Sequence, residues 1–241
     1  MLKSWDERRD YVVGGNAKQT IDFAVEHWIH CAERAIQQRG RFAVALSGGS
    51  TPKAIYERLG KEKLDGAKIW LFWSDERAVA PDHPDSNYRM AMESGLRQLN
   101  IPQSQIFRMV AEKEIEKNAS DYEEKIRHYL GKHLFDLVML GVGEDGHTAS
   151  LFPHSPALEE TERLVVANPI SEKKSWRMTL TFTCIHQSFH SVVYAIGSSK
   201  SMIVPKILDA AILSQFPASR IGTPKQKALW ILDEDAAKNL K

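Results

Sequence analysis

The 241-residue sequence has few cysteines and no excess charge of one sign. Cys31 and Cys184 are too few for a disulfide framework and lack the spacing of metal ligands, which favours a reducing compartment. His27 and His30 likewise lack the H-E-x-x-H spacing of a zinc site, so we interpret them as ordinary helix residues. The formal net charge is only +1. No broad field therefore attracts nucleic acid or an anionic membrane, although a local pocket could hold a small anion.

Segments typical of a membrane span or a secretion signal are also missing. No apolar stretch approaches the roughly 20 residues of a membrane helix, and the charged opening "MLKSWDERRDYVVGG" has no apolar core. We therefore expect a soluble cytoplasmic protein without a membrane, nucleic-acid or obligate protein partner. The chain is 43% hydrophobic and 26% charged, as globular proteins are. Because it contains no linker or repeat, we expect a single domain over residues 1–241.

Strand-like and helix-like segments alternate along the chain. Short apolar runs typical of buried strands occur at 42–46, 69–73, 135–141, 191–197 and 228–232. Helix-like segments lie at 20–40, 52–60, 88–99, 119–131 and 201–213. This order predicts an α/β fold, with a doubly wound, mostly parallel sheet and helices on both faces. Ligands of such sheets bind at the carboxyl ends of the strands, so motifs that directly follow strands are the candidate site.

A Ser/Gly loop follows the first apolar run and precedes a predicted helix. It consists of Ser47, Gly48, Gly49, Ser50 and Thr51. Two glycines allow the backbone to approach a ligand closely, while the hydroxyls and free helix N–H groups can donate to a phosphate. Thr51 is predicted to be the N-cap of the helix. The Walker spacing is absent, and a capped tight turn without a ligand is the alternative interpretation.

Charged residues follow the apolar run at 69–73. Asp75, Glu76 and Arg77 come directly after this buried segment, where packing alone does not explain them. Either carboxylate could orient a base or bind sugar hydroxyls. The guanidinium could hold a phosphate or stabilise an oxyanion. A solvated strand end with a local ion pair is the alternative interpretation.

Two further cations lie at predicted ligand positions. Arg177 stands at the start of an alternating apolar segment, "SWRMTLTF", and Lys200 follows the apolar run at 191–197 near a helix start. Helix N-termini favour anions, so Lys200 is well placed for a phosphate. Each residue alone is more often a simple surface charge.

The stretch "GVGEDGHTASLFP" (141–153) contains a G-x-G-x-x-G pattern directly after a predicted strand. A dinucleotide loop needs a full helix after it, which Pro153 and Pro156 prevent, and the acidic residues inside the pattern would face the pyrophosphate. What remains is a turn that presents Asp145 and His147. Histidine is the usual general base near neutral pH, and a nearby carboxylate can fix its tautomer and support its cation. A structural histidine that caps a turn is the alternative interpretation.

Taken together, these motifs resemble the glucosamine-6-phosphate isomerase/6-phosphogluconolactonase family. The resemblance rests on the order and spacing of "LSGGSTP", "SDER", "DSNYRM", "GVGEDGHTASLFP", "RMTLT" and "GSSK", and it covers about residues 20–232. It implies a phosphosugar enzyme on a modified doubly wound, Rossmann-like fold. It also implies that neither a metal nor an organic cofactor is needed.

Two features are similar to the lactonase branch of this family. The deaminase branch typically continues its G-x-D-G-H motif with "IAFNEP" and has a tyrosine after its Asp-Glu pair, whereas this chain has "TASLFP" and Arg77. The resemblance therefore implies hydrolysis of 6-phospho-D-glucono-1,5-lactone to 6-phospho-D-gluconate, the second step of the oxidative pentose phosphate pathway. The alternatives are a glucosamine-6-phosphate deaminase/isomerase and a non-catalytic phosphosugar sensor.

The lactonase resemblance gives each candidate residue an expected role. His147 would be the general base that activates water, with Asp145 or Asp75 as its partner. Arg77 would stabilise the developing oxyanion. The phosphate would be bound by the remaining candidates: Ser47, Gly48, Gly49, Ser50, Thr51, Arg177 and Lys200.

Overall fold

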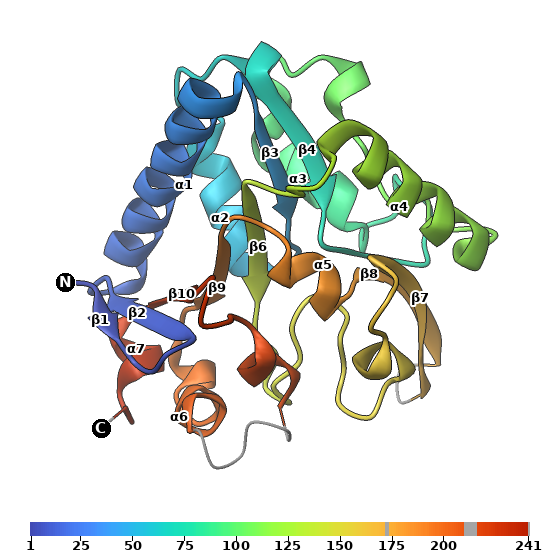
Figure 1. Ribbon diagram of the computed structural model, residues 1–241. Coiled ribbons are helices and arrows are strands. Elements are labelled where there is room, and N and C mark those ends of the chain that lie inside the picture. Colours follow the sequence, from blue (N-terminus) through green and yellow to red (C-terminus); the bar gives the residue numbers. More distant parts are fainter. Residues whose placement is uncertain (172–173, 210–215, 241) are drawn as a thin grey trace.

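The computed structural model describes residues 1–171, 174–209 and 216–240, which form two sheets flanked by helices (Figure 1). The strands of the larger sheet are β1 (Lys3–Ser4), β2 (Arg9–Val13), β3 (Phe42–Leu46), β4 (Ile69–Trp73), β6 (Leu137–Gly141), β9 (Ser191–Ala195) and β10 (Ala228–Leu232). The smaller sheet contains β5 (Asp75–Arg77), β7 (Val165–Ile170) and β8 (Ser175–Leu180). The helices are α1 (Ala17–Arg39), α2 (Ser50–Leu59), α3 (Asn87–Ser94), α4 (Ile115–Leu130), α5 (Phe182–His186), α6 (Ile203–Leu208) and α7 (Glu234–Ala237).

The larger sheet has the order β1-β2-β10-β9-β6-β3-β4, and its strands are parallel except for β1. Helices flank this sheet on both sides, with α1 on the left and α4 on the right in Figure 1. The predicted doubly wound, mostly parallel α/β fold is therefore confirmed. Among the described residues, no helix is both long enough and apolar enough to span a membrane.

The predicted strands at 42–46, 69–73 and 228–232 have the same bounds in the structure. They are easy to recognise because β3 is buried along its whole length and β4 and β10 almost so. The strands predicted at 135–141 and 191–197 are shorter than expected and form β6 and β9.

The predicted helices are present with shifted ends. α1 ends at Gly40, as predicted, because this residue adopts the left-handed conformation with φ +76°. The segment predicted at 88–99 is split into α3 and a 3₁₀ helix, Leu96–Leu99. The helix predicted at 201–213 contains α6, and residues 210–213 of it lie outside the described residues.

The sequence analysis did not predict β2, which begins with a charged residue. Arg9 at its start is fully buried. Its guanidinium pairs with Asp6 and donates to the carbonyls of Ile207 (2.8 Å) and Leu208 (3.3 Å) at the end of α6. These long-range partners satisfy the buried charge of an arginine that the sequence alone would place at the surface.

The position of the site follows from a reversal of strand order at β3. β3 pairs with β4 on one side and with β6 on the other, although β4 comes before β6 in the chain. The loops after β3 and β6 therefore diverge and open a crevice at the carboxyl edge of the sheet. Ser74 joins the smaller sheet to this edge, because its N–H donates to Leu46 and its carbonyl accepts from Leu180.

The hydroxyl of Tyr122 on α4 supports the edge strand β4. It accepts from the backbone N–H of Trp73 (2.9 Å) and donates to the carbonyl of Phe107 (3.0 Å). Because Tyr122→Phe leaves a buried N–H unpaired, we expect it to lower the free energy of unfolding by about 1–3 kcal/mol in chemical denaturation. Tyr129→Phe, on the exposed side of the same helix, is the control and should change stability little. Equal losses in the two variants would contradict this role of the Tyr122 hydroxyl.

Candidate active site

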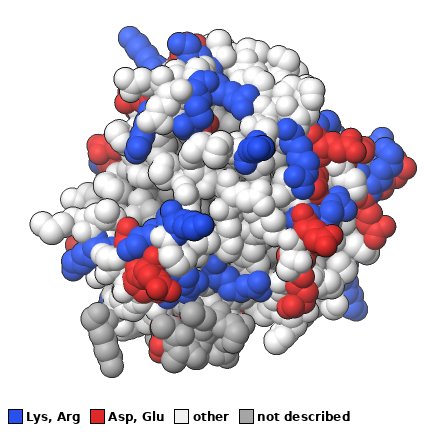
Figure 2. Space-filling view, viewed as in Figure 1, with Lys and Arg blue, Asp and Glu red and all other residues white. Residues whose placement is uncertain are grey.

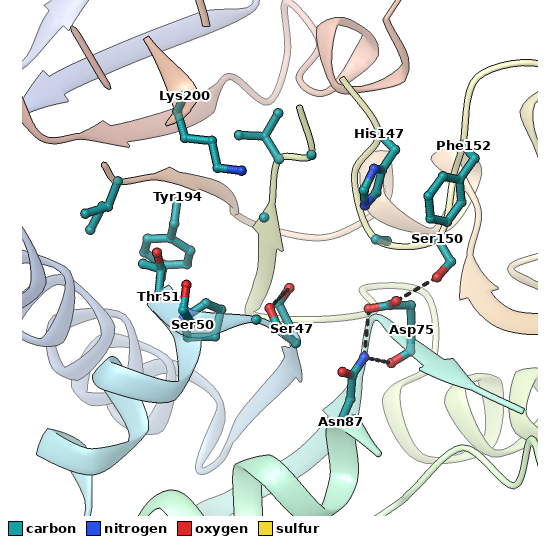
Figure 3. Close-up of a pocket in the computed structure, with 18 of the residues that line it drawn as sticks. Ser47, Ser50, Thr51, Asp75, Asn87, His147, Ser150, Phe152, Tyr194 and Lys200 are labelled. Atoms are coloured by element: carbon teal, nitrogen blue, oxygen red, sulfur yellow. Dashed lines mark hydrogen bonds between the residues drawn. The ribbon is translucent and has the colours of Figure 1, made fainter. Parts of the chain in front are cut away.

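A polar cavity of about 350 Å³ lies at the carboxyl edge of the larger sheet (Figure 3). Of the predicted site residues, all except Asp145 line this cavity, and Asp145 contacts the lining residue His147. The structure thus brings together the loops that follow β3, β6 and β9 with the strands β5 and β8. Other lining residues were not predicted, and Asn87, Ser150, Phe152 and Tyr194 are among them.

A buried tyrosine on α2 fixes the start of the loop after β3 by two hydrogen bonds. The Tyr56 hydroxyl accepts from the N–H of Ser47 (3.0 Å) and donates to its carbonyl (2.9 Å). The predicted N-cap at Thr51 is wrong: the helix begins at Ser50 after Gly49, whose φ of +101° turns the chain earlier than predicted. Since no side chain caps this end, the N–H groups of the first turn remain available to a ligand.

A buried hydrogen-bond network crosses the floor of the cavity. Asp75 is only 7% exposed; its Oδ2 accepts from the Ser150 hydroxyl (2.7 Å) and its Oδ1 from Asn87 Nδ2 (3.3 Å). Asn87 Nδ2 also donates to the Asp75 carbonyl (2.9 Å). A Cβ atom at Gly48 would lie 2.1 Å from Asn87 Oδ1, so this loop position requires glycine. Figure 3 shows the network as dashed lines beneath His147.

The carboxylate partner of His147 is Asp145. Its Oδ1 lies 2.5 Å from Nδ1 of the imidazole and accepts the backbone N–H of His147 (3.1 Å). The imidazole stacks on Phe152 with ring centroids 4.1 Å apart. A Cβ atom at Gly143 would lie 2.1 Å from Nδ1, so this glycine makes room for the ring. These contacts occupy Nδ1 and leave Nε2 for a ligand.

The charge of Asp145 is stabilised by this pair. Partial burial alone would raise the pKa of the Asp145 carboxyl, but the hydrogen bond and the charge of His147 lower it to about 2. The carboxylate therefore stays ionised beside the imidazole.

Glu76, the other acidic residue after β4, has a structural role. Its carboxylate accepts the N–H groups of Asn87 and Tyr88 (2.8 Å each) and the Ser86 hydroxyl (2.9 Å), and thereby caps the first turn of α3. Burial raises its pKa despite these bonds. Glu76 does not line the cavity.

Three cations line the cavity, and none of them has a carboxylate partner among the described residues. Arg77 lies directly opposite Arg177 in the β5–β8 register, and Lys200 lies across the cavity from His147 (Figure 3). Within the described residues, none of the three cations forms an ion pair, and the two guanidinium groups donate only to the carbonyls of Asp85 and Trp176. Burial, and then the charge of Arg77, lowers the pKa of Arg177. Adjacent unpaired cations of this kind favour a bound anion.

The fold and the cavity define a class of protein. It is a doubly wound α/β protein with a crevice lined by cations at a switch point and an Asp–His pair in the same crevice.

Comparison with known proteins identifies the family. Residues 15–230 match the family "Glucosamine-6-phosphate isomerases/6-phosphogluconolactonase". A 6-phosphogluconolactonase of Chlamydia pneumoniae is 45% identical over 221 residues, covering 90% of this chain and 84% of that protein. One from Chlamydia muridarum is 41% identical over 240 residues, covering 98% and 93%. The structure of 6-phosphogluconolactonase from Trypanosoma cruzi superposes with a TM-score of 0.88 at 29% identity, covering 100% and 99%. The chain therefore belongs to the glucosamine-6-phosphate isomerase/6-phosphogluconolactonase family.

The Asp145–His147 pair predicts a pH-dependent contribution to stability. The folded-state pKa of Asp145 lies below its unfolded value of 3.8, so the stabilisation is present above about pH 4 and is lost as the pH falls toward 2. Asp145→Asn should lower the free energy of unfolding at pH 7 by about 1 kcal/mol, discounted because the carboxylate is 43% exposed. Urea denaturation should show this difference narrowing below about pH 4. The control is Glu144→Gln in the same turn; a difference for Asp145→Asn that does not vary with pH would contradict the pairing.

Proposed function

We propose that this protein hydrolyses 6-phospho-D-glucono-1,5-lactone to 6-phospho-D-gluconate, the second step of the oxidative pentose phosphate pathway. The observation that carries the proposal is the Asp145–His147 pair in a cavity that also holds unpaired cations and a free helix N-terminus. The substrate has a dianionic phosphate at one end and an electrophilic ester carbonyl at the other, so it needs both features. The names of the similar proteins support the same activity.

The phosphate is bound by the loop after β3 and by the cations. The residues that bind it are Ser47, Gly48, Gly49, Ser50, Thr51, Arg177 and Lys200. Backbone N–H groups of a helix start donate to phosphate oxygens, and the cations supply charge. Binding at this remote group positions the lactone ring over Asp75 and His147. The carboxylate of Asp75, on the floor of the cavity, accepts a hydrogen bond from a hydroxyl of the sugar.

His147 is the general base of the reaction. Its Nε2 takes a proton from water while the water oxygen bonds to C1 and the carbonyl electrons move to the oxygen. The tetrahedral intermediate then breaks its C1–ring oxygen bond, and the imidazolium returns the proton to that oxygen. Asp145 stabilises the imidazolium in between. General-base catalysis of this type accounts for about 10²–10⁴-fold in rate.

Arg77 stabilises the negative charge on the carbonyl oxygen. Turn N–H groups are weaker candidates for this role, because those of Gly143 and Gly146 already donate to carbonyls within the turn. Because Arg77 lies beside Arg177, the oxyanion and the phosphate share one cationic surface. A positioned donor at the oxyanion contributes about 10²–10³-fold.

The segment "TASLFP" favours the lactonase over the deaminase. In this chain it supplies the aromatic ring of Phe152 against the imidazole and the Ser150 hydroxyl to Asp75, where the deaminase branch would carry a glutamate. Among the described residues, Asp75 is the only carboxylate that lines the cavity. Both oxygens of Asp75 already accept hydrogen bonds from the protein, so Asp75 is a poor base and proton transfer depends on His147.

The proposed activity predicts faster decay of the lactone. The substrate is generated from glucose 6-phosphate with glucose-6-phosphate dehydrogenase, and its disappearance is followed with and without the protein. We expect decay well above the spontaneous rate, and His147→Ala should lower kcat by about 10²–10⁴-fold with KM little changed. His128→Ala, on the surface of α4, is the control.

Two outcomes separate the rival functions. Decay at the spontaneous rate, with ammonia released from glucosamine 6-phosphate, indicates the deaminase. Saturable binding of phosphosugars with neither reaction indicates a sensor.

The cations of the cavity predict a KM effect. Lys200→Ala and Arg177→Ala each remove a charged donor to the phosphate, so each should raise KM by about 10- to 100-fold and change kcat less. Steady-state kinetics with the same lactone assay measures both constants. Lys206→Ala, at an exposed position of α6, is the control. An unchanged KM in both variants would place the phosphate elsewhere.

A further inference from the structure

We propose that the protein has a second binding site, for phosphate or a small phosphorylated metabolite, at the amino edge of the larger sheet. A cavity of about 280 Å³ lies there between α1 and the residues that immediately precede β6 and β9. This volume is just below the roughly 300–1,000 Å³ of typical small-molecule sites, which suits a small anion. His190 precedes β9, whose other end carries Tyr194 of the first cavity, so the two sites are on the order of 15 Å apart.

One wall of this second cavity is fixed by an internal ion pair. Arg39 donates from Nε to Asp136 Oδ1 (2.7 Å) and from Nη1 to Gln38 (3.0 Å), and its guanidinium lies 4.2 Å from the ring centre of Phe189. The second oxygen of Asp136 accepts the N–H of Ala43 (2.7 Å). Asp136 is the only carboxylate among the described residues of the lining, and its charge is already paired.

The remaining polar groups of the lining are cationic or neutral donors. Arg34 has no ion pair or hydrogen bond with the described residues, and His27, His30 and His190 line the same cavity. Burial lowers the pKa of His27 to about 4, and burial and then Arg34 lower the pKa of His190. Both rings are therefore neutral near pH 7. The nitrogens of the His27 ring already contact Cys31 Sγ (3.8 and 3.9 Å), whereas the ring of His190 has no hydrogen bond with the described residues and can offer its N–H to a ligand.

The charge of Arg34 decides which ligand fits. A free guanidinium repels a metal ion and attracts an oxyanion, with which it forms two parallel hydrogen bonds. The negative end of the α1 dipole lies at the last turn of the helix, beside Gln38 and Arg39, so an anion is favoured at the Arg34 side of the cavity. Figure 2 shows Lys and Arg side chains gathered over the upper end of α1.

Histidine ring signals report the two cavities separately. In NMR spectra of the protein labelled at its histidine rings, titration with inorganic phosphate at constant ionic strength should shift His30 and His190 saturably. His147 reports the first cavity in the same titration. Arg34→Gln should weaken the response of His30 and His190 by about tenfold or more and leave that of His147 unchanged.

Two matched variants complete the test. Lys200→Ala should weaken the response of His147 and leave that of His190 intact. Arg97→Gln, at an exposed arginine outside both cavities, should leave both responses intact. The second site is refuted if phosphate does not shift the ring signals of His30 and His190, or if it shifts them equally in Arg34→Gln and in the unmodified protein. Since lactone decay is not measured, neither result depends on the proposed hydrolysis.

Discussion

The buried carboxylate of Asp75 is the constraint on which the crevice depends. A carboxylate that is 7% exposed is costly unless its oxygens are hydrogen-bonded, and here the donors come from Ser150 and Asn87. Asp75 itself begins β5, and its donors lie in the loop after β6 and at the start of α3. Satisfying this one charge therefore fixes three chain segments relative to each other. Gly48 completes the junction, because its missing side chain lets the loop after β3 contact Asn87.

With these loops fixed, the cavity has an excess of positive charge. The cross-strand pair of Arg77 and Arg177 is unfavourable for folding, because like charges directly opposite each other repel. The uncapped start of α2 likewise leaves backbone donors without partners. Both features become favourable when an anion is bound. Local destabilisation of this kind is typical of functional sites. Glu76 differs from these residues, because its charge is satisfied by backbone N–H groups at the start of α3.

Most of the larger sheet could be predicted from the sequence, because continuous apolar runs mark strands that are buried on both faces. β2 could not, since the charge of Arg9 is satisfied by carbonyls about 200 positions away in the chain. The candidate site follows the same division. The residues directly after strands were identified by the rule that ligands bind at carboxyl ends. Asn87 and Phe152 lie in motifs that carry the family resemblance, but their contacts with Asp75 and His147 are visible only in the structure. The N-cap was misplaced because the backbone angle of Gly49, rather than the hydroxyl of Thr51, begins the helix.

The G-x-G-x-x-G pattern has a geometric explanation in this chain. Gly143 is needed because the imidazole of His147 occupies the space that a Cβ atom would take. Gly146 is needed because its φ is +79° and because a Cβ atom there would lie 2.6 Å from the ring of Phe216. Gly143 thus makes room for the imidazole of His147 beside Asp145, and Gly146 turns the chain between these two residues. A dinucleotide loop uses the same glycines to admit a pyrophosphate from outside. The pattern thus reports a close backbone approach, and the neighbouring side chains decide what approaches: here it is the chain's own imidazole.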